Sequence, residues 1–574
     1  MRKRSTIFII LVLLTVLVAC EGEETEELTF SSAFPATPTI APLPPNASIA
    51  AHIRARGYLR VGVRYDDAPF GSVDGEGGLV GFDVDLAHEF AFRWLGDADA
   101  VKFVQVTEGS VNDRIKDEQV DLIIGALSPH QGIAESMSFS LPYYYDGLSL
   151  LVRAGPGLTN TVSINGPGDL EGVAVAVVEE SDTEAPLSRA AAPAVPQVIY
   201  YPDYFSAVAG LQNGVVQAVV GPQRTLMRLA GEAGGMEVTP RFTRDPYVIG
   251  LPQGDGAFCD LVNVTLMNMI NDGTYHSFFQ TWFPDQAFPE LEILSGTSRL
   301  DFRGLSDTLG SSPGTIEAIQ ARGYLIAGLL DEQLPFSDLD ANGVARGFEA
   351  ELVRALVGRW LGSVTAVQFV RHSESSGVAA LQTGQIDLLV GGLPRTLPRE
   401  DDVDFSLTYY LGGLGLLVRA ESGINGVVNL AGGAVAVSGG SDVAEVVRSA
   451  AAQAGVVVSL QTVGDANTAL TGVAEGTYRA YVDWRRELLR LAYTSAGFVV
   501  PDQRLTRRPI AMGLRQGDGA FRDLVNLTLQ ELAAEGRLAA LYDDWFGTDP
   551  VFPVEIWPGN PYRPLKLSPA SQAP

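Results

Sequence analysis

Blocks of apolar and polar residues alternate along this chain and predict strands and helices in turn. Val120 to Leu127 is a continuous apolar run, as expected of a buried parallel strand. In GFDVDLAHEFAFRWLG, which begins at Gly81, apolar residues recur mostly at helical spacing. Strands are also predicted from Leu59 and Leu325. This alternation predicts an α/β fold with mainly parallel sheets, whose ligands bind beyond the carboxyl ends of the strands.

The whole pattern occurs twice. QGDGAFCDLVNVTL begins at Gln253 and QGDGAFRDLVNLTL at Gln516, and 12 of their 14 positions are identical. The mismatches are Cys259 against Arg522 and Val264 against Leu527. The unit of about 240 residues is far longer than a solenoid repeat of roughly 20–50 residues. We therefore expect two tandem homologous domains, copy 1 (51–290) and copy 2 (315–555), with a linker (291–314) and a tail (556–574).

The repeated motif is expected to open a helix in each copy. Leu261, Val262 and Leu266 should pack inward, and Asp260 and Asp523 should serve the helix dipole rather than a ligand. The polar connector between the copies predicts that each copy folds alone.

The chain begins with MRKRSTIFIILVLLTVLVAC, in which a basic flank precedes a run of 13 apolar residues from Ile7 to Ala19. A membrane-spanning helix needs about 20 residues, so residues 1–20 are predicted to be a signal peptide. LVAC resembles a bacterial lipobox, which implies a lipidated Cys20 and attachment to the outer side of the cytoplasmic membrane. Residues 21–50 are acidic and then Pro-rich, which predicts a disordered tether.

Charge and composition narrow the function further. The formal net charge is −28, and removal of three signal-peptide bases leaves 37 − 68 = −31, so nucleic acid is not expected as a partner. Cys259 is the only cysteine besides Cys20, which leaves no intrachain disulfide in the mature domains. The five histidines have no metal-ligand spacing, and we expect neither a metal nor a cofactor.

Several motifs in fixed order resemble the bacterial family 3 solute-binding proteins, the polar-amino-acid receptors of ABC importers. The motifs are APFGSVDGEGGLVGFDVDLA, VDLIIGALSP, MSFSLPYYYDGLSLLVRA and DLEGVAVAVVEES, with the closing QGDGAF segment. The resemblance implies an α/β fold of two tandem two-lobed, periplasmic-binding-protein-like domains, each lobe a mainly parallel sheet flanked by helices. Lobe 1 would come from the beginning and end of each copy and lobe 2 from the middle, with hinges near Leu150 and Leu416. Closure of the lobes would bury a ligand.

In copy 2 the resemblance assigns a carboxylate-binding turn. Thr396 and Arg399 match the family's Thr-x-x-Arg pattern, and a guanidinium there could hold a carboxylate bidentately. Arg395 could be the functional arginine if the register is displaced. Gly392 at the preceding strand end is a further candidate contact. Ser441 and Asp442 stand at a predicted helix start, where they could cap the helix, hold a carboxylate, or both.

Copy 1 departs from this pattern because Ile133 stands where the arginine belongs and His130 where the threonine belongs. An apolar side chain cannot hold a carboxylate, so copy 1 should bind carboxylates poorly or prefer a neutral or cationic solute. Its candidate contacts are Asp67, Phe70, Ala126, Ser128, Ser181 and Asp182. Ser181 and Asp182 could equally be helix caps.

The family's ammonium-binding acid is replaced in both copies, by Pro222 and Trp484. Asp483 lies one residue early, which turns its side chain to the opposite face of a strand. Only Asp67 or Asp483 could supply the missing contact. Phe70 and Phe336 match a family phenylalanine, with either a ligand or a core role, whereas Asp67 and Gln333 replace the family's aromatic wall.

These features favour a lipid-anchored extracytoplasmic receptor for amino acids or similar small polar solutes, with an ABC permease as its partner. One alternative is a ligand sensor or scaffold that acts through a partner protein. A third is an enzyme on the same fold, which we do not expect because Asp, Glu and His form no coherent cluster.

Overall fold

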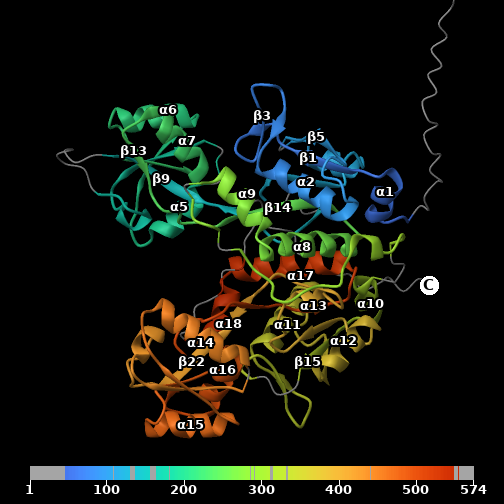
Figure 1. Cartoon of the computed structure of the whole chain (residues 1–574), viewed down its shortest axis with the longest axis vertical. Helices are drawn as coiled ribbons and strands as arrows, with labels where there is room; N and C mark the ends of the chain where they lie inside the picture. Colours follow the sequence, from blue (N-terminus) through green and yellow to red (C-terminus); the bar gives the residue numbers. More distant parts are fainter. Residues whose placement is uncertain are drawn as a thin grey trace, which may run out of the picture. The chain divides into compact units, whose positions relative to one another are not determined.

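The structure is a computed structural model that describes residues 46–107, 109–129, 136–154, 163–179, 181, 183–284, 286–289, 291–309, 314–330, 334–439, 441–547, 552 and 554. Cys20, His130, Ile133, Asp182 and Gln333 lie outside the described residues. Both copies belong to one compact unit, and each consists of two α/β lobes, as predicted (Figure 1). In the described part of the chain, no helix has the length and apolarity to cross a membrane.

Lobe 1 of copy 1 contains a sheet with the strand order β5-β1-β6-β14-β7, in which β8 also pairs with β14. Strands β5, β1 and β6 are parallel, whereas β14 runs antiparallel to β6. The sheet strands are β1 (Leu59–Val63), β5 (Val101–Gln105), β6 (Leu122–Leu127), β7 (Met137–Phe139), β8 (Tyr144–Asp146) and β14 (Asp245–Pro252). A small sheet of β2 (Asp66–Asp67), β3 (Gly71–Val73) and β4 (Leu79–Val80) lies in the same lobe. The helices are α1 (Ile49–Arg56), α2 (Phe82–Leu95), α3 (Val111–Lys116), α8 (Gly256–Asn271) and α9 (Thr274–Trp282).

Lobe 2 of copy 1 is built on the order β11-β10-β12-β9-β13. Its strands are β9 (Leu148–Arg153), β10 (Ala174–Val178), β11 (Gln197–Tyr201), β12 (Ala218–Pro222) and β13 (Met236–Val238). Its helices are η1 (Pro167–Asp169), α5 (Glu184–Ala191), α6 (Tyr204–Gln212) and α7 (Gln223–Ala233). Separate buried clusters lie on the two faces of this sheet, so helices cover both faces.

Copy 2 repeats this plan. Its lobe 1 sheet has the order β18-β15-β19-β28-β20, and its lobe 2 sheet has the order β24-β23-β25-β22-β26. Lobe 1 contains β15 (Leu325–Leu330), β16 (Asp338–Leu339), β17 (Ala345–Arg346), β18 (Val367–His372), β19 (Leu388–Val390), β20 (Asp404–Phe405), β21 (Tyr410–Gly412), β27 (Arg508–Ile510) and β28 (Gly513–Leu514), with α10 (Thr315–Arg322), α11 (Phe348–Leu361), α12 (Glu374–Gln382), α13 (Leu397–Glu400), α17 (Gly519–Ala534) and α18 (Arg537–Phe546). Lobe 2 contains β22 (Leu414–Arg419), β23 (Ala434–Val437), β24 (Ser459–Thr462), β25 (Ala480–Trp484) and β26 (Phe498–Val499), with η3 (Val427–Leu430), α14 (Ser441–Gln453), α15 (Ala466–Glu475) and α16 (Arg485–Thr494).

The first of the two crossings between lobes lies at a glycine in each copy. Leu150 and Leu416, near which hinges were expected, lie inside the lobe 2 sheets, and the crossings come slightly earlier, at Gly147 and Gly413. A Cβ atom at Gly147 would lie 2.3 Å from the carbonyl oxygen of Thr243, which belongs to the returning segment. Gly413 has φ +131°, and a Cβ atom there would lie 1.9 Å from the carbonyl oxygen of Thr506. The two crossing segments therefore approach so closely that only glycine fits.

The repeated QGDGAF segment starts α8 and α17, as predicted, and Leu261, Val262 and Leu266 are buried in the core of copy 1. The capping residue of α8 is Asp255, which accepts hydrogen bonds from the amides of Phe258 at 3.0 Å and Ile49 at 2.9 Å. Asp518 caps α17 in the same way and also accepts from Thr315. This aspartate thus satisfies amide groups at the starts of two helices in each copy.

The expected helix-dipole role of Asp260 and Asp523 gives way to a buried position between the copies. Asp260 on α8 lies 3.8 Å from Arg522 on α17, and Asp523 accepts a hydrogen bond from Ser138 of copy 1. A Cβ at Gly256 would lie 2.7 Å from Gly517, so the two helix starts touch (Figure 1). The two copies thus share a direct interface.

The described part of the connector (291–309) packs on both copies. Leu291, Leu294 and Phe302, the last in η2 (Phe302–Gly304), belong to the hydrophobic core of copy 1. The Ser295 carbonyl accepts a hydrogen bond from the amide of Leu397, a copy 2 residue that is itself buried in the copy 1 core. The expectation that each copy folds alone stays a prediction, but an isolated copy would expose this shared surface.

Candidate functional site

The contacts between the lobes of copy 1 centre on Arg224, in the first turn of α7. Its Nη1 forms an ion pair with Asp67, and its Nε lies 3.9 Å from Asp146. Its guanidinium carbon lies 5.0 Å from the centroid of the Phe70 ring, a cation–π distance, and its Nη2 lies 3.5 Å from the Tyr247 hydroxyl. We call these five residues the copy 1 interlobe cluster.

Arg224 stays positively charged in this cluster. Burial alone would lower the pKa of Arg224, but Tyr247, Asp67 and Asp146 raise it above its ordinary value. Burial raises the pKa of Asp146, although Arg224 opposes that shift. Asp67 was predicted to touch ligand, and the structure places it against Arg224 of its own chain. It therefore cannot serve an ammonium group unless Arg224 moves away.

Of the two roles that the sequence left open for Phe70, the structure shows the core role, and the ligand role stays a prediction. Phe70 is fully buried and packs edge-on against Tyr144 at 5.0 Å and Tyr247 at 5.3 Å, while Arg224 lies near its ring. Phe336 in copy 2 is also fully buried, edge-on against Tyr410 at 5.0 Å. Both phenylalanines are thus core residues, and Phe70 also borders the interlobe region.

The backbone amides of the predicted contacts Ala126 and Gly392 donate hydrogen bonds to buried acids. The Ala126 amide donates to Asp83 at 2.9 Å, and the Gly392 amide donates to Glu349 at 2.8 Å. Ala126 has φ 48°, an unusual left-handed value that turns its amide toward Asp83. Burial raises the pKa of both Asp83 and Glu349 to about 7. These amides are therefore unavailable to a ligand in this arrangement.

The prediction that Ser181 could cap a helix in copy 1 was wrong. The Ser181 hydroxyl donates to the Val178 carbonyl at 2.6 Å and lies 2.9 Å from the Thr183 hydroxyl. Helix α5 begins at Glu184 with Thr183 as its N-cap residue, so Ser181 is not the cap. Ser128 is half-buried next to the end of β6. In copy 2, Ser441 and Asp442 do open α14, as predicted.

Arg399 in copy 2 lies where the sequence placed it, in α13 after β19, with Thr396 as the N-cap residue. Both its Nε and its Nη2 donate to Oε1 of Glu374, the former at 2.9 Å, and its Nη1 donates to the Pro394 carbonyl at 3.2 Å. The Arg399 fork therefore holds a carboxylate of the chain itself. Because the Glu374 side chain is 48% exposed, an incoming carboxylate could compete with it.

Two further arginines lie near Arg399, and the sequence reasoning missed both. Arg486, at the start of α16 in lobe 2, donates to the Gly392 carbonyl at 3.1 Å. Arg508 lies 4.4 Å from the ring centroid of Trp484, a cation–π contact. Burial and the charges of Arg399 and Arg486 lower the pKa of Arg508 to about 10. We call Arg399, Arg486, Arg508 and Glu374 the copy 2 interlobe cluster.

Asp483 does not replace the missing ammonium acid. Its two carboxylate oxygens accept hydrogen bonds from the Tyr481 hydroxyl at 2.5 Å and from the Trp484 amide at 2.8 Å. The one-residue shift therefore engages this acid with a tyrosine of its own strand, as the alternation of strand side chains predicts.

A comparison of paired positions shows how the two interlobe clusters diverged. Arg224 of copy 1 aligns with Arg486 of copy 2, so one arginine is common to both. Asp245 in the segment RDP aligns with Arg508 in the segment RRP, and Asp146 aligns with Gly412. Copy 1 therefore surrounds its arginine with acids, whereas copy 2 adds arginines. Arg508 could have been found from the sequence by looking for positions at which one copy has an acid and the other has an arginine.

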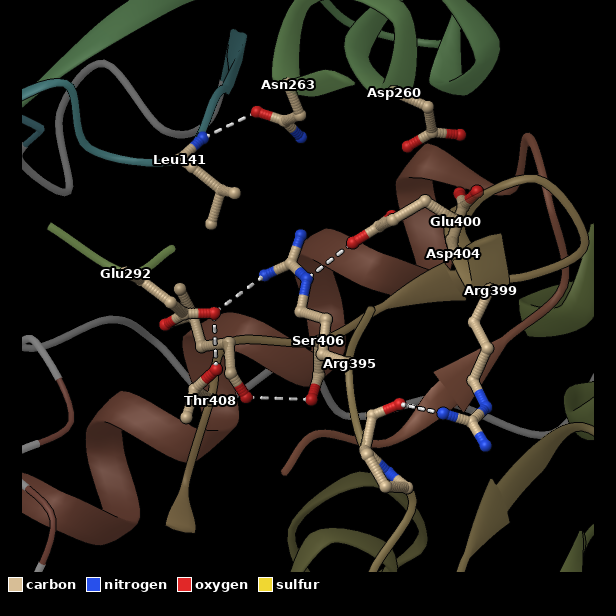
Figure 2. Close-up of polar contacts among 12 residues, drawn as sticks. Leu141, Asp260, Asn263, Glu292, Arg395, Arg399, Glu400, Asp404, Ser406 and Thr408 are labelled. Atoms are coloured by element: carbon tan, nitrogen blue, oxygen red, sulfur yellow. Dashed lines mark hydrogen bonds and ion pairs between the residues drawn. The ribbon is translucent and has the colours of Figure 1, made fainter. Parts of the chain in front are cut away.

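Arg395 is excluded as a substitute for Arg399. It is only 5% exposed, donates to Glu400 at 2.6 Å and lies 3.7 Å from Glu292 of the connector. Figure 2 shows that Arg395 points toward Glu292 and Glu400, whereas Arg399 extends away from them. The Arg395 side chain therefore belongs to the interface between the copies.

A cavity of ≈ 190 Å³ lies at this same interface. Its lining includes Leu141 and Arg244 of copy 1, Glu292 of the connector, and Arg395, Thr408 and Arg507 of copy 2. It is distinct from both interlobe clusters. Among the described residues, no group of three or more His, Cys, Asp and Glu side chains could hold a metal ion.

Comparison with known proteins identifies the family of this chain. The sequence profile of the bacterial extracellular solute-binding proteins, family 3, matches residues 59–285 and again residues 325–548. The chain therefore belongs to this family and contains two tandem copies of its domain.

Individual relatives match the length of one copy. The ABC transporter glutamine-binding protein GlnH of Bacillus subtilis is 26% identical over 41% of this chain and 84% of its own. The L-cystine-binding protein TcyJ of Escherichia coli K12 is 27% identical over 43% of this chain and 91% of its own. Among solved structures, a mutant of ArgBP from T. maritima is 26% identical, with a TM-score of 0.32, over 42% of this chain and all of its own.

Proposed function

We propose that this protein is a lipid-anchored extracytoplasmic receptor whose copy 2 binds a small carboxylate-bearing solute, such as an amino acid, for delivery to an ABC importer. The observation that carries the proposal is the gathering of Arg399, Arg486 and Arg508 between the lobes of copy 2. Membership in the solute-binding family supports a receptor for polar solutes outside the cytoplasm. The relatives named above include proteins that bind glutamine and cystine.

The electrostatics of the cluster favour an anionic group. Burial lowers the pKa of Arg508 most, the positive charges of Arg399 and Arg486 lower it further, and Glu374 forms an ion pair with Arg399. A ligand carboxylate would relieve this repulsion and could form charge-assisted bidentate hydrogen bonds. Because arginine is not a practical proton donor or acceptor, the cluster is suited to binding rather than to acid–base catalysis.

Calorimetry on the mature chain tests the ligand class. We expect small carboxylates, including acidic and neutral amino acids, to bind, and we expect Arg399→Ala and Arg508→Asp each to weaken that binding by roughly 2 kcal/mol. The variant Arg448→Ala is the matched control, since Arg448 lies on the surface of the same copy with 60% of its side chain exposed. Unchanged affinity in both test variants would refute the site.

The importer partner is tested separately from the ligand. Uptake of the radiolabelled ligand should fall in cells that lack this protein and recover with the wild type but not with Arg399→Ala. Normal uptake combined with a lost transcriptional response to the ligand would instead support the sensor alternative.

A further inference from the structure

The copy 1 interlobe cluster surrounds a guanidinium with groups that recognise cations. Asp67 and Asp146 supply carboxylates, and Phe70 and Tyr247 supply aromatic faces whose ring centroids lie 5.0 Å and 6.0 Å from the guanidinium carbon of Arg224. Paired carboxylates together with aromatic rings are a recurring environment for guanidinium and ammonium ligands.

The partners of Arg224 come from a different part of the copy than Arg224 itself. Asp67 and Phe70 belong to lobe 1, Asp146 and Tyr247 lie on the strands that lead to the crossings, and Arg224 starts a helix of lobe 2. In a two-lobed receptor, a bound solute makes such a link between lobes. Arg224 therefore joins the lobes as a solute would, with no solute required.

The fit of this guanidinium is incomplete. Oδ2 of Asp67 and Nε of Arg224 are both buried, and neither has a hydrogen-bond partner among the described residues. Because the guanidinium is tethered to helix α7, its position relative to Asp67 is limited by the reach of the Arg224 side chain. An untethered guanidinium has no such restriction and could donate to both oxygens of Asp67.

The aligned arginine of copy 2 makes different contacts. Arg486 donates to a backbone carbonyl and is close enough to Arg399 for that charge to lower its pKa, after the larger effect of burial. Glu349, Glu374 and Glu487 also act on Arg486 and raise its pKa, so acids as well as a cation lie near it. Arg486 donates to a backbone carbonyl where Arg224 forms an ion pair with Asp67, so the same helix position provides a control within one molecule.

From this geometry we propose that Arg224 is a built-in ligand of copy 1: its guanidinium occupies a site that would otherwise bind a free guanidinium-type cation. Copy 1 is then a latent cation site whose occupant belongs to the chain. This inference does not rest on the carboxylate site of copy 2, because the two sites share no residue and differ in charge.

The test measures methylguanidine binding to the mature protein by calorimetry. Methylguanidine has no carboxylate, so the arginines of copy 2 should not bind it. We expect Arg224→Ala to bind it at least tenfold more tightly than the wild type, and a second substitution, Asp67→Asn, to remove the gained binding. Arg486→Ala should gain no binding.

Equal binding by the wild type and Arg224→Ala, or an equal gain in Arg486→Ala, would overturn the proposal. If Arg224→Ala does not fold unaided, methylguanidine added at millimolar concentration during refolding should restore the folded circular-dichroism signal, whereas equimolar methylammonium should restore less. Failure of that rescue would also overturn it.

Discussion

Nη1 of Arg522 lies 3.8 Å from Oδ1 of Asp260, so a helix of copy 2 supplies a positive charge to the equivalent helix of copy 1. Arg522 also lies 3.9 Å from Asp404, and all three residues are almost fully buried. Burial and mutual repulsion raise the pKa of Asp260 well above its ordinary value, although Arg522 opposes that shift. One arginine thus offsets a pair of buried acids at the interface.

Arg522→Ala should therefore destabilise the protein. Removal of one partner from a buried charged group leaves the other uncompensated, which costs about 3–5 kcal/mol. Urea unfolding of the mature chain measures the loss, and Arg537→Ala on exposed surface near the same helix is the control. A loss no larger than that of the control would mean that the acids are protonated and do not need Arg522.

The copies should remain together after the connector is cut. A protease site inserted between Leu309 and Gly314 would break the chain while leaving the Leu397, Arg395 and Arg522 contacts intact. Gel filtration after cleavage should show one species with the mass of the intact chain. Separation into two halves would show that the interface is too weak to hold without the covalent link.

Stability should fall as the pH rises from about 4 to about 7, in part because of Glu349. Burial raises its folded-state pKa from 4.5 to about 7, so the folded protein retains a proton that the unfolded chain releases. As the pH rises from 5 to 8, ionisation of Glu349 should lower the free energy of unfolding by about 2 kcal/mol. Above about pH 8, where the folded carboxyl is also ionised, its contribution should no longer change.

Glu349→Gln removes that proton equilibrium and should flatten the pH dependence, measured as the free energy of unfolding at pH 5 and pH 8. Glu351→Gln, on the same helix with a partly exposed side chain, is the control. Identical slopes in the two variants would contradict the assignment of a raised pKa to Glu349.

Glu374→Gln should increase the affinity of copy 2 for carboxylates. The Glu374 carboxylate forms an ion pair with Arg399 and must give way to a ligand carboxylate. Since a partly exposed ion pair contributes about 0.2–1 kcal/mol, the gain should be no more than about fivefold. Glu445→Gln, at an exposed ion pair elsewhere in copy 2, should leave the affinity unchanged. Weaker binding in Glu374→Gln would show that this acid helps to hold the ligand.

Cys20 is predicted to carry the lipid anchor. Cys20→Ala should abolish metabolic labelling of the protein with a radioactive fatty acid and release it from the membrane fraction. Equal labelling of wild type and variant would disprove lipidation at this residue.

Local patterns were enough to predict much of the fold. The apolar run to Leu127 and the helical spacing after Gly81 became β6 and α2, since each side chain pattern reflects burial within a single element. The duplication was visible because both copies kept the motif after Gln253 and Gln516. Arg399 could be placed because its turn follows directly from one strand.

The interlobe partners could not be predicted in this way. Arg508 and Arg486 come near Arg399 only because the chain crosses between lobes twice, so no local spacing relates the three. The start of α5 was misplaced because Ser181 bonds to the preceding turn, a choice between two local hydrogen bonds that composition does not decide. The shared interface was missed because α8 was judged from its inward face alone.

The contact between α8 and α17 also bears on how this gene could evolve. Cys259 and Arg522 occupy the same position in the repeat, and the charge of Arg522 acts on Cys259. In a symmetric pair of identical subunits, both positions would have to change together, and two arginines would then repel. Fusion into one polypeptide lets each half mutate separately. A difference such as Cys259 against Arg522 then makes each half depend on contacts with the other, so that loss of one half would destabilise what remains.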